Sequence, residues 1–302
     1  MATDKGVAAS RLTILVPFLW LVFFFVLPFL IVLKISLSDD ALSQPPYAPV
    51  FQITDGIAGF FAKLRQLDFE NYFLVGGDWL YVYSFLQSVA IAAIGTFILL
   101  IVGYPVAYAI ARAPRHIRPM LLLLVVLPFF TSFLIRVYAL IAIISPEGLL
   151  NTFLRWSGII DAPLQIHSTN IAVVLGIVYS YFPFMVLPIY AALERMDDSL
   201  LEAAADLGAR PASAFWKITV PVSMPGIAAG VLLCFIPAVG EFVIPDLLGG
   251  SETQMIGRTV WNEFSVNRSW SVSSALAILI LFVLLVPILF YQRMQLRDLE
   301  RH

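Results

Sequence analysis

Six stretches of this sequence are long, apolar and almost free of charged residues, and they limit the possible folds more than any other feature. A helix needs about 20 apolar residues to cross the hydrocarbon core of a bilayer. The stretches cover residues 12–33, 79–111, 119–145, 162–193, 218–246 and 269–292. They predict an all-α, polytopic membrane protein with six transmembrane helices.

The composition supports the same prediction. Of the 302 residues, 60% are hydrophobic and only 13% are charged, whereas a soluble domain contains about 25% charged residues. The net charge of −2 gives no indication of a nucleic-acid partner. The single cysteine, Cys234, cannot form an intrachain disulfide and provides no Cys/His metal motif, so we expect it to pack within a span.

The basic residues predict the orientation, because loops rich in Lys and Arg remain on the cytoplasmic side. An even number of spans places both termini on one side, which carries Lys5, Arg11, Arg112, Arg115, Arg118, Arg195, Arg210, Lys217, Arg293, Arg297 and Arg301. The opposite loops are longer but carry only Lys63, Arg65, Arg155, Arg258 and Arg268. We therefore expect a cytoplasmic N-terminus over residues 1–11, a transmembrane domain over 12–292 and a cytoplasmic tail over 293–302. The acidic external loop over 38–78 either contacts another protein or is simply solvated.

The cytoplasmic loop over residues 196–221 carries clear signals for two short helices. Ser199 with Glu202 three residues later predicts a capping box that starts the first helix. Gly208 is suited to the left-handed conformation that ends it. Pro211 is placed to start a second helix and Pro221 to end it. The residues leave two interpretations open: a knob that docks into a soluble partner, or a well-capped connector.

Part of this loop resembles a known family motif. Glu202-Ala203-Ala204, Gly208 after three further residues, and Ile218 and Pro221 resemble the EAA loop of permease subunits of binding-protein-dependent ABC importers. Val220 departs mildly from the leucine of the family pattern. The segments 128–138 and 235–250 resemble the polyamine branch, especially putrescine-type permeases, and the likeness extends over about residues 12–292.

The resemblance implies a type I importer permease of the bacterial inner membrane. Its loop would sit on an ATPase subunit, with coupling residues at Glu202, Ala203, Ala204, Gly208 and Arg210. The implied partners are a second homologous permease subunit, two cytoplasmic ATPase subunits that bind ATP-Mg, and a periplasmic solute-binding protein. Since this chain contains no G-x-x-x-x-G-K-[ST] phosphate-binding loop, we expect no cofactor on it and no catalysis of its own.

Three ionisable residues lie inside the predicted spans: Arg136, Glu241 and Asp246. An ionisable group in the hydrocarbon costs about 2.5–3.5 kcal/mol, so each requires a role. The two carboxylates could bind the ammonium groups of a polyamine such as putrescine or spermidine. Aromatic rings attract cations to their faces, and the rings that could contribute belong to Tyr138, Tyr179, Tyr181 and Tyr190.

Other roles remain open for the same residues. Arg136 could form a structural ion pair with Glu241, Asp246 could cap a helix end, and the tyrosines could be packing residues or interfacial anchors. A second functional hypothesis is a stand-alone secondary transporter with Glu241 or Asp246 as its proton site. That hypothesis predicts uptake that needs no ATPase. It also predicts an internal inverted repeat, and the sequence does not show one.

Overall fold

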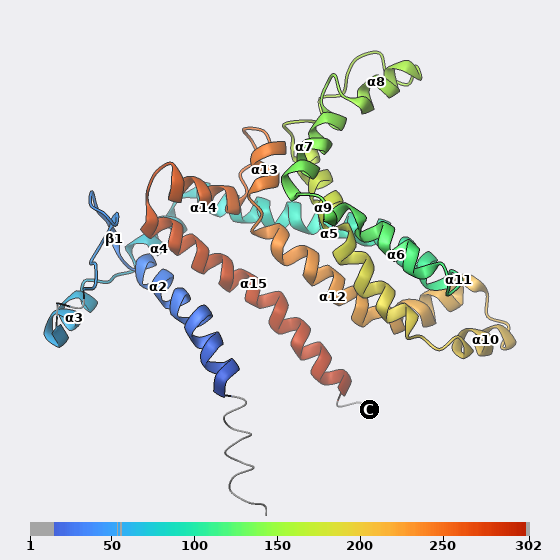
Figure 1. Cartoon of the computed structure of the whole chain (residues 1–302), viewed down its shortest axis with the longest axis horizontal. Helices are drawn as coiled ribbons and strands as arrows, with labels where there is room; N and C mark the ends of the chain where they lie inside the picture. Colours follow the sequence, from blue (N-terminus) through green and yellow to red (C-terminus); the bar gives the residue numbers. More distant parts are fainter. Residues whose placement is uncertain (1–14, 53, 55, 300–302) are drawn as a thin grey trace, which may run out of the picture. The chain divides into compact units, whose positions relative to one another are not determined.

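The computed structural model describes residues 15–52, 54 and 56–299 (Figure 1). Within them, six helices are long and apolar enough to span a membrane: Leu15–Ser36, Trp79–Arg112, Phe133–Trp156, Asn170–Glu194, Pro211–Val239 and Trp270–Leu289. The predicted all-α fold with six spans is confirmed. The chain divides into two compact units, one built from residues up to Val82 with Val260–Val283, the other from Tyr83–Thr259 with the residues from Leu284 onward.

The first unit begins with an apolar helix in which a π-helical turn, η1 (Val22–Val26), leads into α2 (Leu27–Ser36). A short antiparallel pair follows, β1 (Asp39–Asp40) with β2 (Tyr47–Ala48), and then α3 (Gly56–Leu64) and α4 (Glu70–Gly77). Asn71 is buried and donates from Nδ2 to the carbonyl oxygens of Ser36 (3.1 Å) and Ser38 (2.8 Å). This contact ties α4 to the end of α2.

Two carboxylates organise the rest of this unit. Asp40 accepts hydrogen bonds from the hydroxyl of Ser269 and the backbone N–H of Ser271. It therefore caps the start of α15 (Trp270–Leu299), where free N–H groups need acceptors. Glu263, on α14 (Ile256–Ser265), is buried and accepts from the hydroxyl of Tyr81 (3.0 Å) and the amide of Asn267 (2.9 Å).

The second unit is a bundle of apolar helices: α5 (Trp79–Arg112), α6 (Arg118–Val126), α7 (Phe133–Ile144), α9 (Asn170–Glu194) and α12 (Val220–Val239). Its core contains Leu99, Met185, Ile189 and Cys234, all fully buried, which confirms the packing role expected for the cysteine. The backbones of α9 and α12 approach closely at Gly226, where an added Cβ would lie 2.6 Å from the carbonyl oxygen of Pro188. Small residues permit such close packing between membrane helices.

The third predicted span is not one continuous helix. After α6, a 3₁₀ turn, η3 (Leu127–Phe130), carries Pro128, and Thr131 is extended with φ −97° and ψ 155°. Pro128 has no backbone N–H to donate, and its ring disfavours a regular helix at this point. The chain resumes in α7, and α8 (Leu149–Trp156) follows. The break lies near the middle of the predicted span.

Candidate functional site

The loop predicted to couple to a partner forms two short helices, α10 (Ser199–Asp206) and α11 (Pro211–Ala214), near the end of α9 (Figure 1). Gly208 has a φ of +73°, so the predicted left-handed end of the first helix is confirmed. Its N–H donates to the carbonyl of Ala205 and that of Ala209 to the carbonyl of Ala204, both at 2.9 Å. This pattern is a Schellman motif, which closes the end of α10.

Two details of this segment correct the sequence prediction. The capping box does not form, because Ser199 is already helical and its N–H donates to a carboxylate oxygen of Asp197 at 3.0 Å. That hydrogen bond lowers the pKa of Asp197. The second helix does not end at Pro221. A π-helical turn, η4 (Phe215–Thr219), connects α11 to α12, and Pro221 lies in the first turn of α12, where its missing N–H is tolerated.

The surface of the segment shows which residues a partner can reach. Glu202, Ala203, Gly208 and Arg210 are exposed, whereas Ala204 is buried against the rest of the chain. The most exposed apolar residue is Leu207, at 89%. The sequence analysis did not single out Leu207. Its position directly before the turn glycine is the signal that could have identified it as an exposed apolar residue.

The segment is fixed to α5 by both polar and aromatic contacts. Arg112, at the end of α5, forms an ion pair with Asp198, which precedes α10. The ring of Phe215 makes edge-on contacts with Tyr104 and Tyr108 of α5, with ring centroids 5.6 and 5.8 Å apart. These contacts hold the two short helices against a membrane-spanning helix.

Glu241 lies just beyond the end of α12, where the chain breaks before α13 (Val243–Leu248). Its Oε2 accepts a hydrogen bond from the hydroxyl of Tyr181 on α9 at 2.6 Å. Its Oε1 accepts from the backbone N–H of Val243 at 3.0 Å, so the side chain also caps α13. Of the predicted solute residues, these two are brought together by the structure.

The ion pair considered between Arg136 and Glu241 does not form. Arg136 is only 8% exposed, and its Nε and Nη1 have no hydrogen-bond partner within the part of the chain that the structure describes. Its guanidinium carbon lies 4.3 Å from the centroid of the Phe129 ring and 5.7 Å from that of Phe133. The ring faces provide a cation–π environment, while Glu241 is satisfied by neutral donors.

Asp246 is not a free carboxylate. It lies in the first turn of α13, and its Oδ1 is 3.2 Å from Nε of Arg258. The contact is an ion pair without a hydrogen bond, and it is Nη1 of Arg258 that donates to the carbonyls of Gly250 and Thr253, both at 3.3 Å. Both charged side chains are partly exposed, so the pair contributes at most about 1 kcal/mol. A solute cation would compete with Arg258 for this carboxylate.

The four predicted tyrosines do not form one cage. Tyr138 and Tyr179 are exposed, at 57% and 41%, whereas Tyr190 is buried in the core around Leu99 and Met185. Within the described residues, only Tyr181 bonds to one of the predicted carboxylates.

A polar network that the sequence analysis missed holds the segment between α13 and α14. Gln87 donates to the side-chain oxygen of Asn170 (3.3 Å) and the carbonyl of Glu252 (3.1 Å), and accepts from the N–H of Gln254 (2.7 Å). Thr253 donates to the same oxygen of Asn170 at 2.7 Å. The available signal was Gln87, an amide side chain in a span that has no other amide and no charged side chain. The network fixes the segment that lies between Asp246 and Arg258 in the chain.

A bundle of spanning helices with two short, exposed helices between α9 and α12 is consistent with a permease subunit of a membrane transporter. The chain belongs to the family of binding-protein-dependent transport system inner membrane components, whose model matches residues 103–299. This confirms the predicted family, that of type I ABC importer permeases, and the multi-pass inner-membrane location. The stand-alone secondary transporter considered from the sequence belongs to another class.

Among its relatives, the chain is 39% identical to the spermidine/putrescine transport system permease protein PotB of Haemophilus influenzae, over 94% of this chain and 93% of the relative. It is also 39% identical to PotB of Escherichia coli, over 91% and 93%. Among solved structures, a subunit of a bacterial alginate ABC transporter has a TM-score of 0.75 at 17% identity, with 97% and 96% coverage. The MetNI methionine ABC transporter gives 0.53 at 18% identity, with 72% and 94% coverage, and these two likenesses show the fold alone.

Proposed function

We propose that this chain forms half of the membrane pathway for a polyamine such as putrescine or spermidine. A second, homologous permease subunit forms the other half, and a periplasmic solute-binding protein delivers the solute. The observation that carries the proposal is the carboxylate of Glu241, which Tyr181 holds at the break between the spanning helix α12 and the short helix α13. It occurs in a chain whose relatives are named as spermidine/putrescine permeases.

The chemistry of Glu241 suits an ammonium group. An ionised carboxylate offers about four acceptor positions, and the hydroxyl of Tyr181 and the N–H of Val243 occupy two of them at good distances. The remaining positions can accept from an ammonium group, and the ring of Tyr181 can pack on the methylene chain of the solute. A second ammonium group reaches Asp246 only if it displaces Arg258.

The coupling segment, α10 with α11, is proposed to link ATP hydrolysis on a partner to movement of the spanning helices. Two cytoplasmic ATPase subunits bind ATP-Mg, and one of them contacts Glu202, Ala203, Leu207, Gly208 and Arg210. The span that begins with α11 is 29 residues long, or about 44 Å at 1.5 Å per residue. It starts within the coupling segment and ends beside Glu241. A displacement at its cytoplasmic end is therefore transmitted directly to the carboxylate that binds solute.

The test of this function is uptake of labelled putrescine and spermidine into proteoliposomes that contain the chain and its co-purifying partners. We expect uptake to require both ATP and the binding protein. Uptake driven by a proton gradient without ATP would contradict the coupling, and uptake of neither amine would contradict the solute assignment.

Replacing Glu241 with Gln tests the role of the carboxylate. A charge-assisted hydrogen bond contributes about 1.5–3 kcal/mol, so uptake at low solute concentration should fall by about 10- to 100-fold. Glu194→Gln is the control, because Glu194, at the C-terminal end of α9, is half exposed and lies 3.8 Å from Arg118 rather than at the break beside Tyr181. Normal uptake by an assembled Glu241→Gln protein would refute the role. Loss of assembly together with uptake would assign Glu241 to structure alone.

A further inference from the structure

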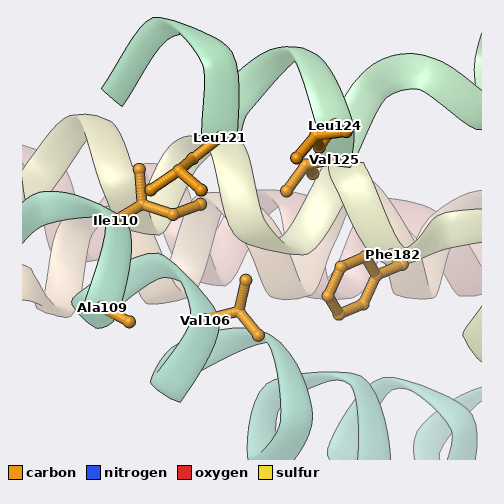
Figure 2. A pocket seen from close by; sticks show the side chains of 7 residues that line it. All are labelled: Val106, Ala109, Ile110, Leu121, Leu124, Val125 and Phe182. Carbon is orange, nitrogen blue, oxygen red and sulfur yellow. The ribbon is translucent and has the colours of Figure 1, made fainter. Parts of the chain in front are cut away.

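An apolar cavity of about 410 Å³ lies between α5, α6 and α9. It is lined by hydrocarbon side chains from three helices: Val106, Ala109 and Ile110 from α5, Leu121, Leu124 and Val125 from α6, and Phe182 from α9. Figure 2 shows the α6 side chains pointing across the gap toward Val106, Ile110 and Phe182. Its volume lies in the range of ligand pockets, about 300–1,000 Å³. The nature of the lining excludes a polar ligand from its interior.

The cavity is bordered by exposed apolar side chains of α6. Leu124 on its wall is 52% exposed, and the neighbouring α6 residues Met120, Leu123 and Leu127 are 64%, 55% and 53% exposed. Ala109 on the opposite wall is also exposed. An empty gap between apolar side chains loses dispersion contacts on both sides. In a bilayer, the group that can restore those contacts is an acyl chain.

The turn that precedes the cavity-lining part of α6 carries a positive charge without a partner among the described residues. The turn over residues 113–117 joins α5 to α6 on the predicted cytoplasmic side, and Leu121 is only about 5 Å along α6 from its first residue. Arg112 is paired with Asp198, and Arg118 donates to the carbonyl of Ala113 at 2.8 Å. Arg115, in the turn itself, is exposed and has no hydrogen-bond or ion-pair partner among the residues that the structure describes.

We propose that this cavity binds one acyl chain of an anionic phospholipid from the cytoplasmic leaflet, and that Arg115 binds its phosphate. The apolar cavity suits the acyl chain of such a lipid, and the unpaired guanidinium on the turn before α6 suits its phosphate. Guanidinium groups bind phosphate through paired hydrogen bonds, and basic sites between membrane helices on this side attract anionic head groups. The bound lipid fills the space between α5 and α6 next to Arg112, which anchors the coupling segment.

The experiment measures phosphatidylglycerol retained by the purified chain with its co-purifying partners, using native mass spectrometry after exchange into phosphatidylcholine nanodiscs. Ala109→Trp fills the cavity and should abolish retention. Arg115→Gln should lower affinity about fivefold, as expected for one basic residue near an anionic lipid. The controls are Ile94→Trp, at a 52% exposed position of α5 outside the cavity, and Arg195→Gln, an exposed basic residue after α9. Both should retain the lipid.

A second measurement keeps the proposal testable if Ala109→Trp does not assemble. Cys234 is the single cysteine of the chain, so Leu124→Cys in a Cys234→Ser background places one fluorescent label at the cavity. Brominated phosphatidylglycerol should quench that label more strongly than brominated phosphatidylcholine, and Arg115→Gln should remove the difference. Equal quenching by the two lipids would overturn the proposal. Cross-linking of Leu124→Cys to a second permease subunit would also overturn it, because the cavity would then be a subunit interface.

Discussion

Replacing Gly208 should weaken energy coupling by an amount set by its backbone conformation alone. Its φ of +73° lies in the left-handed region, and a Cβ built at this position meets no atom within 4 Å. A new side chain therefore causes no clash in the chain itself. The cost is conformational, about 1–2 kcal/mol for an L-residue such as alanine.

That cost converts into a measurable change. If the segment must adopt the observed turn to dock, 1–2 kcal/mol lowers the docking-competent population by about 5- to 30-fold. Asparagine tolerates the left-handed region better than other L-residues, and a β-branched residue tolerates it worst. Uptake and ATPase binding should therefore decrease in the order Gly208, Gly208→Asn, Gly208→Ala and Gly208→Val.

The assay is ATP-dependent uptake in proteoliposomes, combined with titration of the ATPase subunit onto the purified variants. Gly158 provides the matched control, since its φ is +71° and a Cβ there also meets nothing within 4 Å. It lies between α8 and α9, outside the coupling segment. Gly158→Ala carries the same conformational cost and should leave uptake unchanged. Equal losses in the two alanine variants, or full uptake by Gly208→Val, would refute the reasoning.

Two further predictions follow from exposure and packing. Leu207→Asp should reduce binding of the ATPase subunit without changing the melting temperature, because Leu207 is 89% exposed. Leu207→Met should bind the ATPase subunit normally. Equal binding by the two variants would show that Leu207 makes no contact with it. Gly226→Ala should lower the free energy of unfolding by about 1–3 kcal/mol, because its Cβ would lie 2.6 Å from the carbonyl oxygen of Pro188. Gly76→Ala in α4, where a Cβ meets nothing within 4 Å, should not destabilise the protein in the same thermal or chemical unfolding assay.

The features that sequence analysis predicted correctly depend on neighbouring residues. The spans follow from runs of apolar side chains, and the turn at Gly208 follows from one residue that adopts positive φ at little cost. The capping box was wrong for a related reason. Two acceptors compete for the start of α10, and the carboxylate of Asp197 takes the N–H of Ser199. Local chemistry predicts that a helix begins in this region but not which acceptor completes it.

Sequence analysis could not predict the hydrogen bonds between residues that are far apart in the chain. Tyr181 and Glu241 are 60 positions apart, and Gln87 and Gln254 are 167 apart. Each residue taken alone predicts that a partner is needed, because a buried polar group without a hydrogen bond is costly. The identity of the partner depends on how α5, α9 and α12 pack, and helix packing depends on side-chain shape rather than on charge.

Arg136 and Glu241 illustrate the limit of reasoning from charge alone. Opposite charges inside a membrane protein are expected to pair, yet the carboxylate takes a phenolic hydroxyl and a helix N-terminus, and the guanidinium lies over two aromatic rings. Among the residues that the structure describes, Glu241 accepts from neutral donors and forms no salt bridge that would neutralise its charge. A carboxylate held in this way has both a defined position and an unmatched charge, and a cationic solute requires both.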